Sequence, residues 1–277
     1  MHGPRAHPVA FVFQGGGSLA APQVGMLRAL TAAGLQPDLV IGSSAGALNA
    51  VAFASDPSQA GLDAIEAVWR SLGRRQVAPF SARALLAAVT GRAGGLVSQS
   101  ALRGLLAGLP VPRTLEGTSI PAHVVVTELA SGAAVVISDG ETVPALLASC
   151  AFPGLYAPVE LGGRQLVDGG VSAEVPVLQA EALGASVTYV LPAAAYAVPL
   201  VPRGPLPLAG RALSQVLGAV ARYDLATAHG PVHVVPAPDS RAGNPVDFRD
   251  TGRLIDEGYR LATGWLAGQP LLARIGA

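Results

Sequence analysis

The chain has 277 residues, 51% of them hydrophobic and 13% charged, which predicts one large α/β domain, or one domain with a modest subdomain, around a sizeable core. Its 18 basic residues, all arginine, balance 18 acidic residues, and no basic run exceeds Arg74-Arg75, so the composition argues against nucleic acid as a partner. Cys150 is the only cysteine, which excludes an intramolecular disulfide and a C-x-x-C metal or redox site.

The first half of the chain is expected to alternate strands and helices. Residues 9–14 form an apolar run that ends at glycine, as a buried parallel strand does. The expected elements that follow are a glycine loop at 15–18, a helix up to Gly34, a strand from residue 39 to Ser44, helices at 45–54 and 58–72, and two short helices within 74–112.

The second half continues the pattern and sets the expected fold class. The expected elements are a hairpin of strands at 121–127 and 133–137, a short helix at 144–149, a hairpin over 161–167, a strand at 186–191, a loop over 192–210, a helix at 211–228, a strand at 232–235 and a last helix near 248–266. We therefore predict a three-layer α/β/α sandwich with a mainly parallel central sheet.

Two charge-free stretches, 9–27 and 182–202, have the length of a membrane span. Glycines and prolines interrupt both, so neither is expected to form a continuous apolar helix. The start of the chain lacks a convincing signal-peptide pattern. We expect a cytoplasmic protein that is able to contact a membrane surface. Residues 198–208, rich in proline and leucine, are either a lipid-facing lip or a plain surface connection.

The most informative stretch is Gly42-Ser43-Ser44-Ala45-Gly46, a G-x-S-x-G pattern between a strand and a helix. Such a turn holds its serine in a strained conformation, and side chains two positions before and after the serine would collide, so Gly42 and Gly46 remove those collisions. Ser43 does not fit the pattern, because Ile41 and Ala45 flank it at those positions. Ser44 is the candidate nucleophile, and the alternative is an ordinary tight turn.

The glycine loop Gly15-Gly16-Gly17 has two interpretations. With Ala20 it matches a dinucleotide-binding fingerprint, but that function needs an acidic residue at the end of the second strand, and Asp38 lies before that strand. We favour the other interpretation, a cradle of backbone N–H groups for an oxyanion.

A serine nucleophile needs a base within hydrogen-bond reach. His229 and His233 are the late histidines that a Ser-acid-His triad would use, but neither lies in a distinctive loop. Asp168, by contrast, precedes Gly169 and Gly170, as a carboxylate presented on a tight turn would.

Taken together, four motifs resemble the patatin-like phospholipases in order and approximate spacing: 15–18, 42–46, 148–154 and 168–170. The resemblance covers about residues 9–180 and implies a single domain over 9–277, with residues 181–270 completing the sandwich. It implies a serine acyl hydrolase that cleaves carboxylic esters of phospholipids or related lipids. Ser44 would be the nucleophile and Asp168 its base, with Gly169 and Gly170 supporting the turn.

The resemblance also implies an oxyanion hole built from the glycine loop (Gly15, Gly16, Gly17) and Ala45, and an acyl-enzyme intermediate formed without a metal or organic cofactor. The chain departs from the family pattern at Leu19 and Ala20, where a basic residue and a glycine are usual, and at Ala173 and Glu174, where asparagines are usual. The alternatives are a catalytically weak regulatory or binding homologue on the same fold, and a dinucleotide-binding domain.

Overall fold

The computed structural model describes residues 7–77, 94–196, 204–241 and 245–269. Its strands are β1 (Val9–Phe13), β2 (Leu39–Ser43), β3 (Ala122–Glu128), β4 (Ala134–Ile137), β5 (Val159–Leu161), β6 (Arg164–Asp168), β7 (Val187–Leu191), β8 (Ala195–Tyr196), β9 (Val232–Val234) and β10 (Asp239–Ser240). Its helices are α1 (Pro22–Ala32), α2 (Ala45–Ser55), α3 (Gln59–Ser71), α4 (Arg74–Val77), α6 (Ser100–Ala107), α7 (Thr142–Ser149), α8 (Gly170–Ala173), α9 (Val177–Ala182), α10 (Pro205–Thr227) and α11 (Thr251–Ala267), with 3-10 turns at Gly17–Ala20 and Leu115–Gly117.

The central sheet has the strand order β5-β6-β3-β2-β1-β7-β9, and β4 pairs with β3 off this path. The ladders that join β3, β2, β1, β7 and β9 are parallel, whereas β4 and β6 are antiparallel to β3 and β5 is antiparallel to β6. The sheet is therefore mixed and mainly parallel, as predicted.

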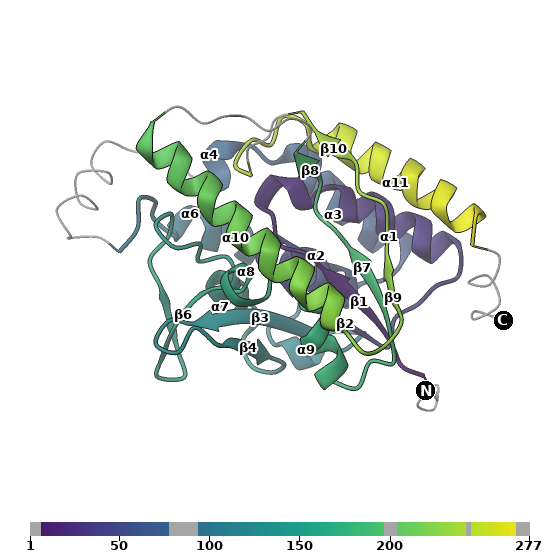
Figure 1. Cartoon of the computed structure of the whole chain (residues 1–277), viewed down its shortest axis with the longest axis horizontal. Helices are drawn as coiled ribbons and strands as arrows, with labels where there is room; N and C mark the ends of the chain where they lie inside the picture. The colour runs from purple at the N-terminus through teal and green to yellow at the C-terminus, as the bar shows by residue number, and fades with distance from the viewer. Residues whose placement is uncertain (1–6, 78–93, 197–203, 242–244, 270–277) are drawn as a thin grey trace.

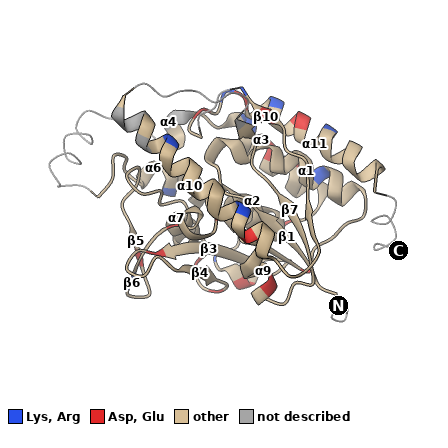
Figure 2. Cartoon of the chain, viewed as in Figure 1, with Lys and Arg blue, Asp and Glu red and all other residues tan. Residues whose placement is uncertain are grey.

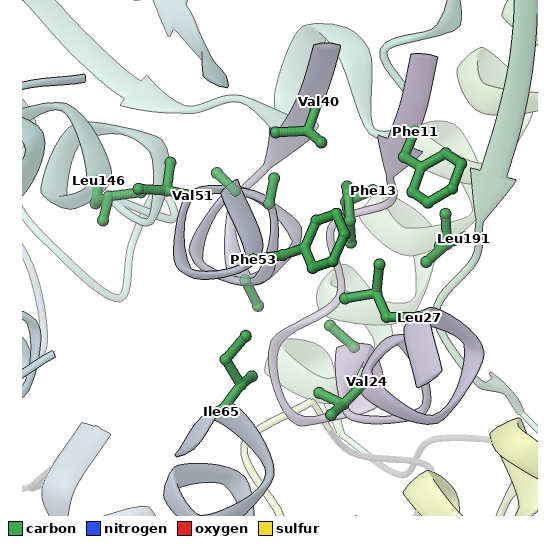
Figure 3. Close-up of a cluster of buried hydrophobic side chains, with 14 of the residues drawn as sticks. Phe11, Phe13, Val24, Leu27, Val40, Val51, Phe53, Ile65, Leu146 and Leu191 are labelled. Carbon is green, nitrogen blue, oxygen red and sulfur yellow. The ribbon is translucent and has the colours of Figure 1, made fainter. Parts of the chain in front are cut away.

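Alternation along the strands divides the core between the two faces of the sheet. Phe11 and Phe13 of β1 point into a large cluster shared with α1, α2, α3, α7 and α11, part of which Figure 3 shows. Ala10 and Val12 point to the opposite face, into a smaller cluster shared with α8, α9 and α10. Figure 1 shows α10 lying across that face, over α8. Helices cover both faces, so the predicted α/β/α architecture is confirmed.

The structure corrects the prediction for the segment after β7. The helix expected at 211–228 begins at Pro205, so the expected loop over 192–210 is wrong at its end, and it also contains the short strand β8, which pairs with β10. Proline suits the first turn of a helix because its fixed φ is helical and its missing N–H is not needed there. Gly204, at φ 101°, supplies the turn that precedes it.

Two expectations fall partly outside the described residues. Of the short helices expected within 74–112, α4 and α6 are present, and residues 78–93 lie outside the described part. Residues 197–203 also lie outside it, and they include most of the stretch 198–208, which the sequence leaves as either a lipid-facing lip or a plain surface connection. In the described ranges, no helix combines the length and the apolar character that crossing a membrane requires.

Candidate active site

Two strands that run toward each other bring Ser44 and Asp168 together. β4 pairs with one edge of β3, along residues that also pair with β2 or β6. β2 and β6 must therefore both lie on the opposite edge of β3. On that edge Ser43 pairs with Val125 and Asp168 pairs with the next residue, Val126. Because β2 is parallel and β6 antiparallel to β3, both strands end at this point. Ser44, one residue beyond β2, therefore lies against Asp168.

Ser44 occupies the strained turn that the G-x-S-x-G pattern predicts. Its φ is 54° and its ψ −130°, and among the described residues no other non-glycine has a positive φ. Such a conformation costs about 1–3 kcal/mol and persists only where the surroundings enforce it. Ser44 is also the N-cap of α2, so its hydroxyl lies at the end of a helix where N–H groups favour negative charge.

The glycines of this turn are needed for close backbone approach. A Cβ at Gly42 would lie 2.6 Å from backbone atoms of Gly46, which is the collision expected from the sequence. A Cβ at Gly46 would instead lie 2.5 Å from the carbonyl oxygens of Phe13 and Gln14. Gly46 therefore allows α2 to begin directly against the end of β1, where the glycine loop starts.

Both carboxylate oxygens of Asp168 accept hydrogen bonds. Ser44 Oγ donates to Asp168 Oδ2 at 2.6 Å, and the N–H of Gly170 donates to Oδ1 at 2.8 Å. The neighbouring Gly169 has no room for a side chain, because a Cβ there would lie 2.2 Å from the carbonyl oxygen of Val125. The Asp-Gly-Gly sequence thus lets the chain turn tightly against β3 and return an N–H to the carboxylate.

Burial changes the acidity of this carboxyl group. Asp168 is 3% exposed, and desolvation raises its pKa to about 7. The hydrogen bonds from Ser44 and Gly170 oppose this shift by stabilising the anion, and the charge of Glu174 adds to it. A carboxyl group with a pKa near neutrality can both take and return a proton at physiological pH.

Hydroxyl groups that the sequence interpretation did not single out hold the two strand ends in place. Ser149 Oγ accepts the N–H of Ser44 at 2.8 Å and donates to the carbonyl of Val125 at 2.7 Å. Thr127 Oγ1 donates to the carbonyl of Asp168 at 2.8 Å. Ser149 lies within the motif at 148–154, so the sequence could have indicated it as a site residue, whereas nothing in the sequence around Thr127 indicates such a role.

The glycine loop and the first turn of α2 offer backbone N–H groups beside Ser44. Gly15 lies against it, since a Cβ there would come within 3.4 Å of Ser44 Cβ, but the N–H of Gly15 already donates to the carbonyl of Glu174 at 3.0 Å. Within the described part of the chain, the N–H groups of Gly16, Gly17 and Ala45 have no acceptor. These three are the donors available to an oxyanion.

The positive φ of the loop explains two of its glycines. Gly16 has φ 155° and Gly17 has φ 58°, in the region that favours glycine. A Cβ at Gly17 would also lie 2.3 Å from the carbonyl oxygen of Pro245. The loop is therefore packed against the segment that precedes α11 and accepts only glycine at this position.

The late histidines and Asp38 have partners elsewhere. His229 Nδ1 lies 3.3 Å from Glu181 Oε2, and the ring of His233 stacks on Tyr189 with centroids 5.0 Å apart. Asp38 Oδ2 accepts the N–H of Val9 at 2.7 Å, at the start of β1 and so at the opposite end of that strand from the glycine loop. These positions favour neither a histidine base for Ser44 nor a ribose-binding acid beside the loop.

Cys150 is buried next to the candidate dyad. Burial raises the pKa of its thiol, and the charge of Asp168 raises it further. The thiol is therefore protonated at neutral pH and behaves as a small apolar side chain.

Comparisons with known proteins agree with the four motifs. The sequence model of one family, described as patatin-like phospholipase, matches residues 11–181. An uncharacterized NTE family protein of Mycobacterium tuberculosis is 29% identical over 188 residues, which cover 68% of this chain and 49% of the relative. Patatin-like phospholipase domain-containing protein 7 of Rattus norvegicus is 26% identical over 181 residues, 65% of this chain and 13% of the relative. The chain thus spans about half the length of the mycobacterial relative.

Two solved structures are also similar. VipD from Legionella pneumophila aligns with 95% of this chain and 67% of its own, at a TM-score of 0.46 and 16% identity. The type III effector protein ExoU aligns with 97% of this chain and 54% of its own, at a TM-score of 0.43 and 15% identity.

Proposed function

This chain belongs to the patatin-like phospholipase family, and we propose that it is a serine acyl hydrolase that cleaves carboxylic ester bonds of phospholipids or related lipids, with residues 9–277 acting as one catalytic domain. The observation that carries the proposal is the 2.6 Å hydrogen bond from Ser44 Oγ to Asp168 Oδ2. It pairs a hydroxyl on a strained helix-capping turn with a buried carboxylate whose pKa is near neutrality.

The first half of the reaction follows from this pair. As Ser44 Oγ attacks the carbonyl carbon of the ester, its proton passes to Asp168. The carbonyl oxygen becomes an oxyanion and accepts hydrogen bonds from the N–H groups of Gly16, Gly17 and Ala45. When the tetrahedral intermediate collapses, the alcohol part of the lipid leaves with the proton held by Asp168. The acyl group remains on Ser44.

The second half reverses the roles. A water molecule attacks the acyl carbonyl while Asp168 takes its proton, and the same N–H groups hold the second oxyanion. Collapse releases the carboxylic acid and returns the proton to Ser44 Oγ. Every step uses one carboxylate as base and then as acid, which a pKa of about 7 suits.

An exposed apolar face on α10 supports peripheral contact with the membrane that holds such a substrate. Leu208, Val216 and Tyr223 are 58%, 59% and 67% exposed, and their spacing of eight and seven residues places them on one side of the helix. The charges of α10 are few (Figure 2), and its acidic residue Asp224 is turned inward and buried. The exposed Arg222 lies beside the apolar face, where it suits lipid phosphate groups.

The experiment that tests the proposed chemistry is intact mass after exposure to a fluorophosphonate, combined with hydrolysis of a soluble ester. We expect a single adduct on the wild type, none on Ser44→Ala, and an unchanged adduct on the control Ser214→Ala, whose hydroxyl lies on exposed α10. Asp168→Asn should slow the reaction strongly. A folded wild type that neither reacts nor hydrolyses esters would contradict the proposal and favour a binding protein on the same fold.

A further inference from the structure

Three buried polar side chains form a connected network behind the glycine loop. Gln23 of α1, Asn49 of α2 and Trp69 of α3 are 0%, 1% and 5% exposed. Burying amide groups costs free energy unless each is hydrogen-bonded, and an apolar core would avoid that cost.

Gln23 holds the start of the glycine loop. Its Nε2 donates to the carbonyl of Gln14 at 2.8 Å and to the carbonyl of Leu191 at 3.0 Å, so it joins the ends of β1 and β7. Its Oε1 accepts Nδ2 of Asn49 at 2.8 Å. All the polar groups of this side chain are thereby committed to the loop, the sheet and α2.

Asn49 holds the other end of the loop. Its Nδ2 also donates to the carbonyl of Ala20 at 3.1 Å, and its Oδ1 accepts the indole N–H of Trp69 at 2.7 Å. An indole nitrogen can only donate, so Trp69 fixes which end of the amide faces the loop. Gln14 and Ala20 flank residues 15–19, so the Gln23–Asn49 pair is hydrogen-bonded to the chain on both sides of the loop.

Helix α2, which contains Asn49, also begins at the candidate nucleophile. Asn49 lies in α2 one turn beyond Ala45, and Ser44 caps that helix. The network therefore connects two separate segments that together supply the oxyanion donors: the glycine loop with Gly16 and Gly17, and the first turn of α2 with Ala45.

We infer that Gln23 and Asn49, oriented by Trp69, are positioning residues that hold the Gly16 and Gly17 N–H groups in register with Ala45 and Ser44. This role rests on the proposed hydrolase function. Small displacements of donors from a developing oxyanion reduce the rate by about 100-fold while ground-state binding changes little. The network therefore acts on kcat and not on KM.

The test compares two tryptophan substitutions. Trp69→Phe removes the N–H that orients Asn49, and Trp265→Phe is the matched control in α11, packed against the same core. We measure kcat and KM on a soluble ester, the rate of fluorophosphonate labelling and Tm, with all rates taken well below each variant's Tm. Trp69→Phe should lower kcat and the labelling rate by about 10- to 100-fold at unchanged KM, and Trp265→Phe should leave all three unchanged.

A second variant keeps the inference testable if Trp69→Phe does not fold. Gln23→Met preserves volume while removing the donors to Gln14 and Leu191, and it should show the same fall in kcat. Folded variants with lowered Tm but wild-type kcat would overturn the inference and leave the network a purely structural feature. An inactive wild type would overturn the proposed function, and the positioning role with it, which is a distinct result.

Discussion

Asp168 ends β6 and Glu174 follows α8, and the two acidic residues are close enough for the charge of Glu174 to raise the pKa of Asp168. Glu174 is itself half-buried: burial raises its pKa, while a hydrogen bond from Gln14 Nε2 at 3.3 Å to its Oε1 opposes that shift. Its carbonyl also accepts the N–H of Gly15. Glu174, which stands where the family usually has asparagine, therefore contacts the glycine loop and also raises the pKa of the candidate base.

The pH dependence of the reaction follows from the acidity of Asp168. Only the ionised carboxylate can accept the Ser44 proton, so kcat/KM on a soluble ester should rise with pH and level off above the pKa of about 7. At pH 5 the rate should be about 100-fold below the plateau, because each unit below the pKa costs a factor of ten. A profile that is flat from pH 5 to pH 8 would rule out Asp168 as the titrating base.

Removing the second acidic group should move that profile. Glu174→Gln takes away a negative charge that raises the pKa of Asp168, so the midpoint of the kcat/KM profile should shift to lower pH. Glu160→Gln, an exposed change in β5, is the matched control and should leave the midpoint in place. If both variants keep the wild-type midpoint, Glu174 does not set the acidity of the base.

The raised pKa of Asp168 has a cost in stability. Between the pKa of an unfolded aspartate, about 4, and the folded value of about 7, the native state binds more protons than the unfolded state, so this group makes stability fall as pH rises. Asp168→Asn keeps the side-chain shape without the buried charge. At pH 8 it should be more stable than the wild type by up to about 4 kcal/mol.

Thermal unfolding at pH 5 and pH 8 checks this expectation. The gain in Tm of Asp168→Asn over the wild type should be larger at pH 8 than at pH 5, and activity should be lost at both. A wild type that is the more stable protein at pH 8 would show that the charged carboxylate is well solvated in the fold, which contradicts its burial.

If α10 contacts the membrane, a change on its apolar face should weaken vesicle binding without changing the hydrolysis of a soluble ester. Val216→Asp should reduce co-sedimentation with phosphatidylcholine vesicles and lower hydrolysis of vesicle lipid, while kcat on a soluble ester stays at the wild-type value. Leu129→Asp is the matched control, because Leu129 is similarly exposed, at 53%, but lies at the turn after β3. Equal vesicle binding by both variants and the wild type would exclude α10 as the contact surface.

The sequence alone predicts the parts of the site that local geometry controls. The strand that ends at glycine, the elbow at Ser44 and the Asp-Gly-Gly turn are each marked by a few consecutive residues, and the structure has all three. The collision that Gly42 avoids is with the backbone of Gly46, four residues away, and is local too. The roles of Ser44, Asp168 and the oxyanion donors stay predictions until the chemistry is measured.

The parts that escaped prediction depend on contacts between distant residues. Gln23 and Asn49 are 26 residues apart, and no periodicity marks two amides that will share a hydrogen bond. Gly46 is required by the end of β1 and not by its own turn, which only the packed sheet reveals. The start of α10 was missed because proline-rich stretches read equally well as a loop or as a first helical turn.

β2 and β6 meet on one edge of β3. The distance between Ser44 and Asp168 is therefore set by the register of these three strands and not by the length of chain between the two residues. Added or deleted residues at a connection such as the Gly162-Gly163 turn would leave the pair at the same distance. A slip of β6 by a single residue along β3 would instead turn Asp168 to the other face of the sheet. The lengths of such connections can therefore vary, whereas the short ladder between β3 and β6 cannot shift without separating the pair.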